Sequence, residues 1–245
     1  MTFFKRIQFK FVQKTLELNE RLIFEKRVNR VLTSILPNKV EVVFDIGANK
    51  GQSIRLFQKW FPGAIIYSFE PNPNLFKELR KNNRGNDKIK LHKLALSNIN
   101  GTRQFNENLF DSSSTLETIN PESKYLRKKS KILGVSPTDL IIDSYPVKVR
   151  MLSDLIKELN LKRVDFIKID VEGHELNCLQ GLFYDLSAKI KCIQIELQSN
   201  DLYANNDNSN KIFELLKKNG FDNYKKVKHG FGSFSDIIFW KSKPT

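Results

Sequence analysis

The most chemically informative residues lie in the segment VVFDIGANKGQS, which spans residues 42–53. A strand-like apolar run there ends at Asp45, and glycines follow at positions 47 and 51. Glycine lets a backbone turn sharply and approach a ligand closely, and the amides at the start of a following helix suit a polar ligand edge. Glu70 ends a second such run, where a carboxylate can accept hydrogen bonds from both ribose hydroxyls of an adenosine. The spacing therefore predicts a nucleotide site.

The type of nucleotide follows from two further details of this turn. Asn49 stands where a dinucleotide-binding GxGxxG turn would have its second glycine. Asp45 would repel a pyrophosphate but can accept hydrogen bonds from an ammonium group. S-adenosylmethionine has an ammonium group and a ribose but no phosphate, so we expect this cofactor. If the two glycines only shaped an ordinary turn, their occurrence together with Asp45 and Glu70 would be unexplained. We therefore prefer the cofactor site.

A second polar group, KIDVEGHE at residues 168–175, also follows a strand-like run. Open α/β sheets bind ligands at the carboxyl ends of their strands. Alternation along a strand places Lys168 and Asp170 on one side, where we expect them in the site, and the following turn brings Glu172 and His174 near. Methylation of a hydroxyl requires a base, and either a histidine or a carboxylate can serve. The pattern leaves Asp170, Glu172 and His174 open as catalytic residues.

Glu196 ends the next strand-like run, IQIEL, and should lie beside Asp170 in a parallel sheet. Carboxylates grouped in this way could hold Mg²⁺, which prefers oxygen ligands and can acidify a hydroxyl. Hydrogen bonds from Glu196 to substrate hydroxyls explain the residue equally well. We therefore predict a substrate role for Glu196 and assign no metal site.

The elements that must position these residues follow from the hydrophobic pattern. From residue 40 onward, short β-rich runs alternate with helical patterns, which indicates a mainly parallel sheet covered by helices on both faces. A third strand over 88–96 is expected to continue into a hairpin through Asn100 and Gly101. The last two strand candidates, at 221–228 and 233–240, are expected to form an antiparallel pair at one edge.

Two basic segments lie outside this rhythm. Residues 1–38 show helical spacing and contain eight Lys or Arg against three Glu. They could form a helix that packs on the domain, a basic amphipathic surface on an anionic membrane through residues 1–30, or both. An insertion at about 119–148 contains a basic cluster that includes Lys128 and Lys129. Such a cluster is either a solvated helix face or a recognition element for a phosphate-bearing acceptor.

Composition narrows the class of protein. The 245 residues are 40% hydrophobic and 28% charged, which excludes a membrane-spanning or disordered chain. The formal net charge of +14 favours an anionic partner. The chain's two cysteines, Cys178 and Cys192, have apolar neighbours and suit reduced core thiols rather than a disulfide scaffold. With no signal-like apolar run at the N-terminus, we expect a cytoplasmic protein with or without peripheral membrane contact.

Four segments occur in order along the chain: DIGANKGQS, FEPNPNLFKEL, LALSNINGT and FIKIDVEGHELNCLQG. Together they resemble the FkbM family of S-adenosylmethionine-dependent methyltransferases. The resemblance implies a class I methyltransferase fold over residues 39–245, with a Rossmann-like sheet of seven strands whose last strand is antiparallel. Residues 1–38 would be a separate helical segment. The residues that the resemblance places around the cofactor are Asp45, Gly47, Ala48, Asn49 and Gly51 at the methionine end, Glu70, Pro71 and Asn72 at the ribose, Ala95 and Leu96 at the adenine, and Ser113 and Asp170 close by.

The resemblance implies methylation of a hydroxyl oxygen. We expect the acceptor to be a sugar in a glycan, a nucleotide sugar or a lipid-linked saccharide. A small secondary metabolite is the main alternative. Methylation of RNA also accounts for the positive charge, but we find no NPPY-type motif, no catalytic cysteine of a pyrimidine methylase and no appended RNA-binding module. A scaffold without catalysis is disfavoured because Asp45 and Glu70 are both present.

Overall fold

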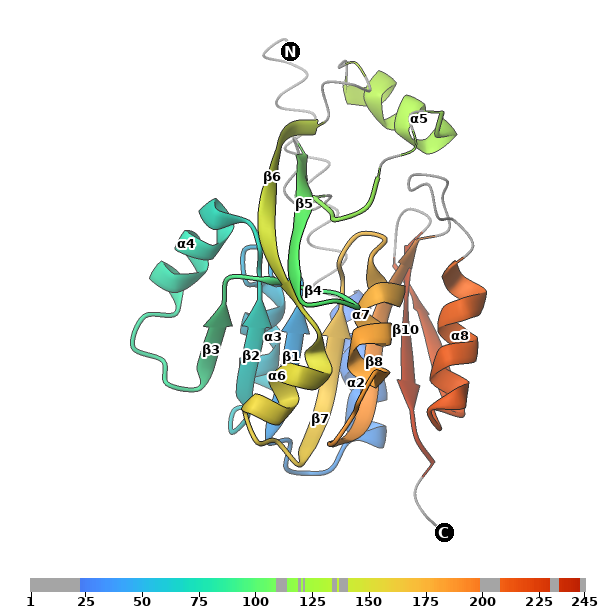
Figure 1. Cartoon of the computed structure of the whole chain (residues 1–245). Helices are drawn as coiled ribbons and strands as arrows, with labels where there is room; N and C mark the ends of the chain where they lie inside the picture. The colour runs from blue at the N-terminus through green and yellow to red at the C-terminus, as the bar shows by residue number, and fades with distance from the viewer. Residues whose placement is uncertain are drawn as a thin grey trace.

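The computed structural model describes residues 23–108, 114–118, 120, 122–133, 136, 141–198, 208–229 and 234–242. Its centre is a seven-stranded sheet with the strand order β3-β2-β1-β7-β8-β10-β9 (Figure 1). The strands are β1 (Val42–Ile46), β2 (Ile65–Phe69), β3 (Ile89–His92), β7 (Arg163–Ile169), β8 (Lys189–Gln198), β9 (Asn223–Lys228) and β10 (Phe234–Trp240).

The pairing of these strands confirms the expected α/β sheet. β1 pairs in parallel with β2 and β7, and β8 continues the parallel set beside β7. β10, the last strand of the chain, runs antiparallel to both β8 and β9. The expected antiparallel pair is therefore present at one edge, and β10 lies between β8 and the edge strand β9.

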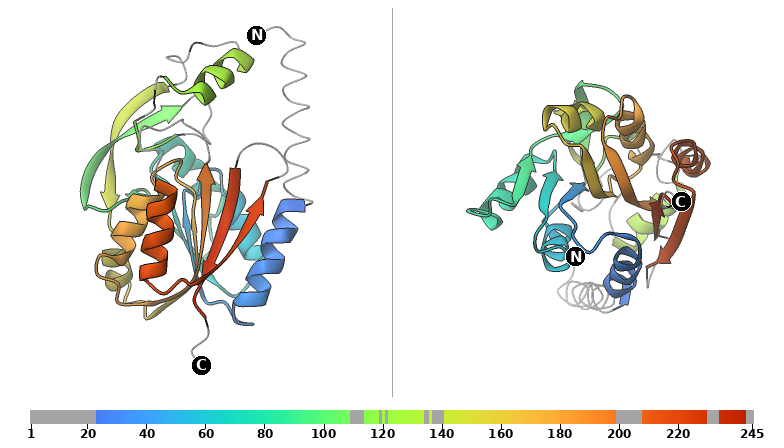
Figure 2. Two further views of the ribbon diagram at one scale, coloured as in Figure 1. Left: turned by 90° about the vertical axis from the view of Figure 1, so that its right-hand side faces the viewer. Right: turned by 90° about the horizontal axis from the view of Figure 1, so that it is seen from below.

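Helices cover both faces of the sheet because successive strand residues point to opposite sides. One face packs against α6 (Leu152–Glu158), α7 (Glu175–Phe183) and α8 (Asn208–Lys218). The other face packs against α2 (Glu25–Ile35), α3 (Gln52–Trp60) and α4 (Pro73–Asn82). In Figure 2, left, α8 and α2 lie on opposite sides of the sheet. Phe44 of β1 enters the first core cluster, whereas its neighbour Val43 enters the second.

A second, three-stranded sheet lies beyond the carboxyl ends of the parallel strands (Figure 1). Its order is β4-β6-β5, formed by β4 (Ala95–Leu96), β6 (Ile141–Arg150) and β5 (Gly101–Asn108). The expected hairpin through Asn100 and Gly101 is wrong, because β6 lies between β4 and β5. The Asn100 side chain instead accepts from Met151 N at 2.9 Å and donates to Asp154 at 2.6 Å, which ties this turn to the start of α6.

The insertion contributes structure to this second sheet. Most of β6 falls within residues 119–148 and pairs antiparallel with β5 along its length. The same insertion contains α5 (Lys124–Leu133), which Figure 1 shows above the carboxyl ends of the central strands. Both elements thus lie on the side of the sheet where open α/β folds bind their ligands.

The N-terminal segment is described from residue 23 onward. The helical pattern expected there appears as α2, whose Val28 and Leu32 are buried against the sheet. Residues 1–22, which include most of the proposed membrane-facing segment, lie outside the described residues. Within the described part of the chain, each helix is too short or too polar to cross a membrane.

Candidate active site

The turn after β1 is shaped by contacts within the protein. Gly47 and Gly51 have φ values of 88° and 80°, and Asn49 between them has φ 47°. The amides of Gly47 and Ala48 donate to the carbonyl of Phe69, at 3.1 and 3.0 Å. A Cβ atom on Gly47 would lie 1.8 Å from the carbonyl oxygen of Asp170. Glycine at position 47 is therefore required for close approach to the β7 end, as well as for the positive φ.

Asp45 lies fully buried at the end of β1. Its Oδ2 accepts hydrogen bonds from Ser53 at 2.9 Å and from Ser68 at 3.4 Å. Its Oδ1 is buried and has no hydrogen-bond partner among the described residues. Burial raises the pKa of Asp45, and the nearby Lys168 ammonium opposes that rise. An unsatisfied buried acceptor at this position fits the ammonium group of S-adenosylmethionine.

Glu70 joins the two loops that would enclose a nucleotide. Its Oε2 accepts from the Asn49 amide at 2.8 Å, and its Oε1 accepts from the Asn72 amide at 2.9 Å. Asn72 in turn caps α4 by accepting from the amides of Asn74 and Leu75. A carboxylate oxygen can accept more than one hydrogen bond, so the two amide contacts of Glu70 are compatible with hydrogen bonds from ribose hydroxyls. Pro71 stands between Glu70 and the helix cap.

The residues expected near the adenine are Ala95 and Leu96. Ala95 and Leu96 form the short strand β4, which is separate from β3, and both are buried. This placement arises because they pair with Val149 and Arg150 at the end of β6. Ser113 lies outside the described residues. Its neighbour Thr115 is buried and donates to the carbonyl of Glu172 at 2.7 Å.

A row of polar side chains crosses the sheet between the two motifs. Ser68, Asp45, Lys168 and Gln194 occupy paired positions on the adjacent strands β2, β1, β7 and β8. The expectation that Lys168 and Asp170 share one side is confirmed, since Lys168 Nζ lies 2.7 Å from Asp170 Oδ2. Burial lowers the pKa of Lys168, but the surrounding carboxylates outweigh burial and raise it. Lys168 therefore keeps its positive charge and lies between the β1 turn and the motif that follows β7.

The turn after β7 bends sharply at Glu172 and Gly173, whose φ values are 55° and 97°. The buried Glu175 side chain holds this turn by accepting from the amides of Val171 at 3.2 Å and Gly173 at 3.1 Å. Burial raises the pKa of Glu175 to about 7. In the insertion helix α5, burial raises the pKa of Tyr125, with further contributions from Glu172 and Glu196. Tyr125 thus lies within electrostatic reach of both strand ends.

His174 occupies an enclosed position at the start of α7. Its ring is 1% exposed, with Nδ1 2.5 Å from Glu117 Oε1 and Nε2 2.9 Å from Ser97 Oγ. Both ring nitrogens are therefore engaged within the protein. To accept a proton from a substrate, His174 would have to give up one of these hydrogen bonds.

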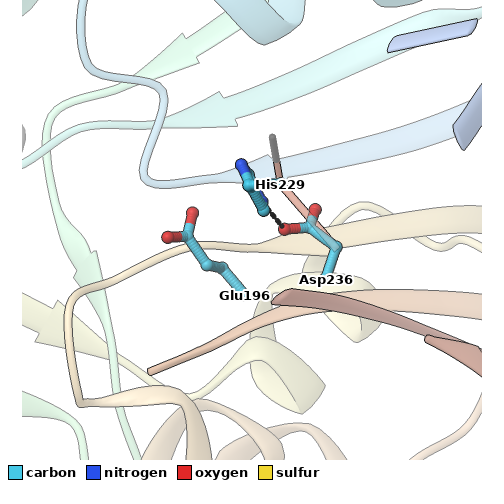
Figure 3. Close-up of side chains that lie close together, drawn as sticks. All are labelled: Glu196, His229 and Asp236. Atoms are coloured by element: carbon cyan, nitrogen blue, oxygen red, sulfur yellow. Dashed lines mark hydrogen bonds and ion pairs between the residues drawn. The ribbon is translucent and has the colours of Figure 1, made fainter. Parts of the chain in front are cut away.

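Glu196 forms a cluster with two residues that sequence reasoning missed, His229 and Asp236 (Figure 3). One potential ligand atom from each lies within 4.8 Å of the others. His229 Nε2 is 2.7 Å from Asp236 Oδ1, and the His229 ring stacks on Phe24 with centroids 3.9 Å apart. Burial and then the neighbouring carboxylates Asp170 and Asp236 raise the pKa of Glu196 well above its ordinary value. An aspartate inside the apolar strand SFSDIIFW was the available sequence signal.

Two basic residues of the insertion were expected to meet substrate. Lys128 is exposed on α5, and the side chain of Lys129 lies outside the described part of the structure. Arg127 on the same helix pairs with Glu122. The exposed position of Lys128 is compatible with either a solvated face or contact with an acceptor.

The family model described as the methyltransferase FkbM domain matches residues 45–222. The chain belongs to this family. It is an S-adenosylmethionine-dependent methyltransferase, and the matched region includes the β1 turn, Glu70 and the motif that follows β7. The family resemblance in the four sequence segments is thereby confirmed.

Two relatives of the chain carry informative names. The chain is 28% identical over 190 residues to the 2-O-methyltransferase NoeI of Sinorhizobium fredii, covering 78% of this chain and 76% of that protein. It is 27% identical over 156 residues to the 31-O-demethyl-FK506 methyltransferase FkbM of Streptomyces tacrolimicus, covering 58% of this chain and 59% of that protein. The chain thus spans less than two thirds of the second relative.

Solved structures support the fold of the family domain. The human methyltransferase 10 domain containing protein matches with a TM-score of 0.51 at 14% identity, over 89% of this chain and 81% of that one. The METTL16 MTase domain matches with a TM-score of 0.51 at 14% identity, over 90% and 67%. At this level of identity the likeness shows the fold alone, which is the class I, Rossmann-like methyltransferase fold.

Proposed function

We propose that this FkbM-family protein transfers the methyl group of S-adenosylmethionine to a hydroxyl oxygen of a sugar. The observation that carries the proposal is the polar row from Asp45 to Lys168 and Asp170, which joins the predicted cofactor loop to a group of carboxylates. The relatives named as O-methyltransferases support oxygen as the acceptor atom. The relative named as a 31-O-demethyl-FK506 methyltransferase supports a small secondary metabolite as the second candidate acceptor.

The cofactor site is proposed to use the β1 turn and Glu70. Asp45 Oδ1 offers a buried acceptor for the ammonium group, and Glu70 offers acceptors for the ribose. When bound, S-adenosylmethionine supplies an electrophilic methyl group on a sulfonium. The remaining proposed contacts are Gly47, Ala48, Asn49, Gly51, Pro71, Asn72, Ala95, Leu96, Ser113 and Asp170.

The chain's own task in the reaction is to hold the acceptor and remove its proton. We propose that Asp170 or Glu172 receives that proton, because carboxylates at a strand end can act as general bases. Lys168 orients Asp170 through their 2.7 Å contact, and Glu196 can bind further acceptor hydroxyls. His174, the third candidate, is enclosed by Glu117 and Ser97, which supports a positioning role for it.

Contacts with anionic partners are proposed for two surfaces. Lys128 and Lys129 on α5 are suited to a phosphate on the acceptor. A groove of about 560 Å³ lies between α2 and β9, lined by Arg27, Arg30, Val31, Lys225, Lys226, Val227 and Lys228. This groove extends the basic N-terminal segment, and we propose it as a peripheral contact with an anionic membrane at the cytoplasmic side.

An acceptor panel tests the proposed function. The full chain is incubated with methyl-labelled S-adenosylmethionine and free sugars, nucleotide sugars, lipid-linked saccharides or small hydroxylated metabolites. We expect labelled product from at least one sugar class, and an Asp170→Asn variant should serve as the inactive control. Label transfer to RNA with no transfer to any hydroxylated small molecule or saccharide would contradict the proposal.

A further inference from the structure

We propose that Glu196, His229 and Asp236 form a binding site for a divalent transition-metal ion. The three residues come from the end of β8, the segment after β9 and the start of β10, and Figure 3 shows them facing one another. The site's use in catalysis would rest on the proposed methyl transfer to a hydroxyl. Its ability to bind metal does not, and can be measured separately.

The donor set is the first observation in favour. One imidazole nitrogen and two carboxylate oxygens lie within 4.8 Å of one another. Donor atoms bound to one transition-metal ion sit about 2.0–2.2 Å from it and hence about 3–4 Å apart. The three donor atoms therefore need to move only slightly closer together to bind one ion. Its members come from adjacent antiparallel strands, where Asp236 pairs directly with Glu196, so the backbone already holds two of the three donors together.

The charge around the cluster is the second observation. Besides its own two carboxylates, Asp170 and Glu172 lie within electrostatic reach of Glu196. Lys168 offsets part of this negative charge: it contacts Asp170 at 2.7 Å and also interacts electrostatically with Asp236. A divalent cation at the cluster would reduce the repulsion among these groups.

Gln194 provides an independent third observation. It is 4% exposed, on the same face of β8 as Glu196, and its amide nitrogen bonds to Asp236. Its amide oxygen is buried without a hydrogen-bond partner in the described structure. Buried amide oxygens are normally satisfied. A water molecule bound to an ion at the cluster would supply the missing donor.

The ligand types indicate which ion to expect. Mg²⁺ and Ca²⁺ prefer sites made only of oxygen, whereas a site with imidazole and carboxylates suits Mn²⁺, Fe²⁺, Co²⁺ or Zn²⁺. An ion bound to His229 Nε2 or to Asp236 Oδ1 would replace the hydrogen bond that joins these two atoms. Three protein ligands leave open coordination positions, which could hold oxygens of a hydroxylated acceptor.

The test uses Mn²⁺ as the probe and the full chain without acceptor. Titration followed by electron paramagnetic resonance should show one bound Mn²⁺ per chain. His229→Gln, Asp236→Asn and Glu196→Gln should each weaken binding at least tenfold. Glu117→Gln is the matched control, because Glu117 also pairs with a histidine but belongs to no such cluster; it should bind Mn²⁺ as the unmodified chain does. Circular dichroism checks that every variant is folded.

Absence of stoichiometric Mn²⁺ binding to the folded chain would overturn the inference. So would binding that all three cluster variants retain. Failure of the proposed function is a separate result: it would appear as normal Mn²⁺ binding with no methyl transfer to any hydroxyl. Conversely, normal methyl transfer by a folded chain that binds no Mn²⁺ when the ion is titrated without a chelator would leave the function intact and overturn the metal site.

Discussion

At the scale of single residues, Asp45 and Glu70 are the two carboxylates proposed to hold opposite ends of the cofactor. Asp45 has a buried oxygen with no partner among the described residues, whereas Glu70 already accepts two amide hydrogen bonds. Asp45 therefore offers an unmet interaction, whereas Glu70 is already held in place by the two loops that it joins. This difference explains why a carboxylate is kept fully buried at position 45 despite the cost of desolvation.

Neutralising either carboxylate should weaken cofactor binding. We expect Asp45→Asn and Glu70→Gln each to cost about 1.5 to 3 kcal/mol, the range for a hydrogen bond to a charged group. That corresponds to a roughly ten- to hundredfold loss of affinity for S-adenosylmethionine by calorimetry. Asp185→Asn, at an exposed ion pair with Lys157, is the matched control. Unchanged affinity in both site variants would contradict the cofactor assignment.

The buried position of His174 bears on whether a carboxylate or this histidine is the general base. If a carboxylate is the base, Asp170→Asn or Glu172→Gln should lower kcat by about two to four orders of magnitude. His174→Ala should lower thermal stability, because it leaves Glu117 and Ser97 without their partner. A drop in kcat of the same size for His174→Ala, with an unchanged rate for both carboxylate variants, would make His174 the base instead.

At the scale of elements, the turn between β7 and α7 depends on one buried carboxyl group. Glu175 accepts two backbone amides there, and burial raises its pKa from 4.5 to about 7. The unfolded chain therefore releases this proton at lower pH than the folded chain does. The stabilising contribution is full below pH 4.5 and is lost as the pH rises to about 7.

Glu175→Gln should remove that pH dependence while its amide oxygen still accepts from the turn. We expect the unmodified chain to lose about 3 kcal/mol of unfolding free energy relative to the variant between these two pH values. Urea unfolding of both proteins at several pH values measures the difference. Parallel curves for the two proteins across this range would show that Glu175 does not titrate as proposed.

The helices and strands show which parts of the fold could be predicted from the sequence. The alternation of strands and helices predicted the parallel sheet and its antiparallel edge pair, because both depend on local pattern. The hairpin at Asn100 failed because the true partner of β5 is β6, which returns from the far side of the insertion. His229 and Asp236 were missed because their meeting with Glu196 depends on the register of β10, which no local pattern reveals.

At the scale of the whole molecule, part of the basic surplus behind the net charge of +14 lines one groove. The groove between α2 and β9 gathers cations from segments about 200 residues apart in sequence, such as Arg27 and Lys226. Phe24, just before α2, stacks on His229 at the carboxyl ends of the strands. The N-terminal helix thus links this basic surface to the candidate site.

Neutralising the groove should weaken attachment to anionic membranes. We expect Lys225→Gln with Lys226→Gln to weaken binding to phosphatidylglycerol vesicles by roughly thirtyfold in a flotation assay, because each basic residue near such a surface contributes about 1 kcal/mol. Lys128→Gln on α5 is the matched control and should float as the unmodified chain does. Equal flotation of all three proteins would exclude the groove as the contact.

The central claim is that the protein moves a methyl group from S-adenosylmethionine onto a hydroxyl oxygen. Its most direct test is to isolate the product from the most active acceptor and locate the new methyl group by mass spectrometry and nuclear magnetic resonance. We expect a methyl ether on one sugar hydroxyl, with one S-adenosylhomocysteine formed per methyl transferred. A methyl group found on nitrogen or carbon, or cofactor bound without turnover on any hydroxyl, would contradict the claim.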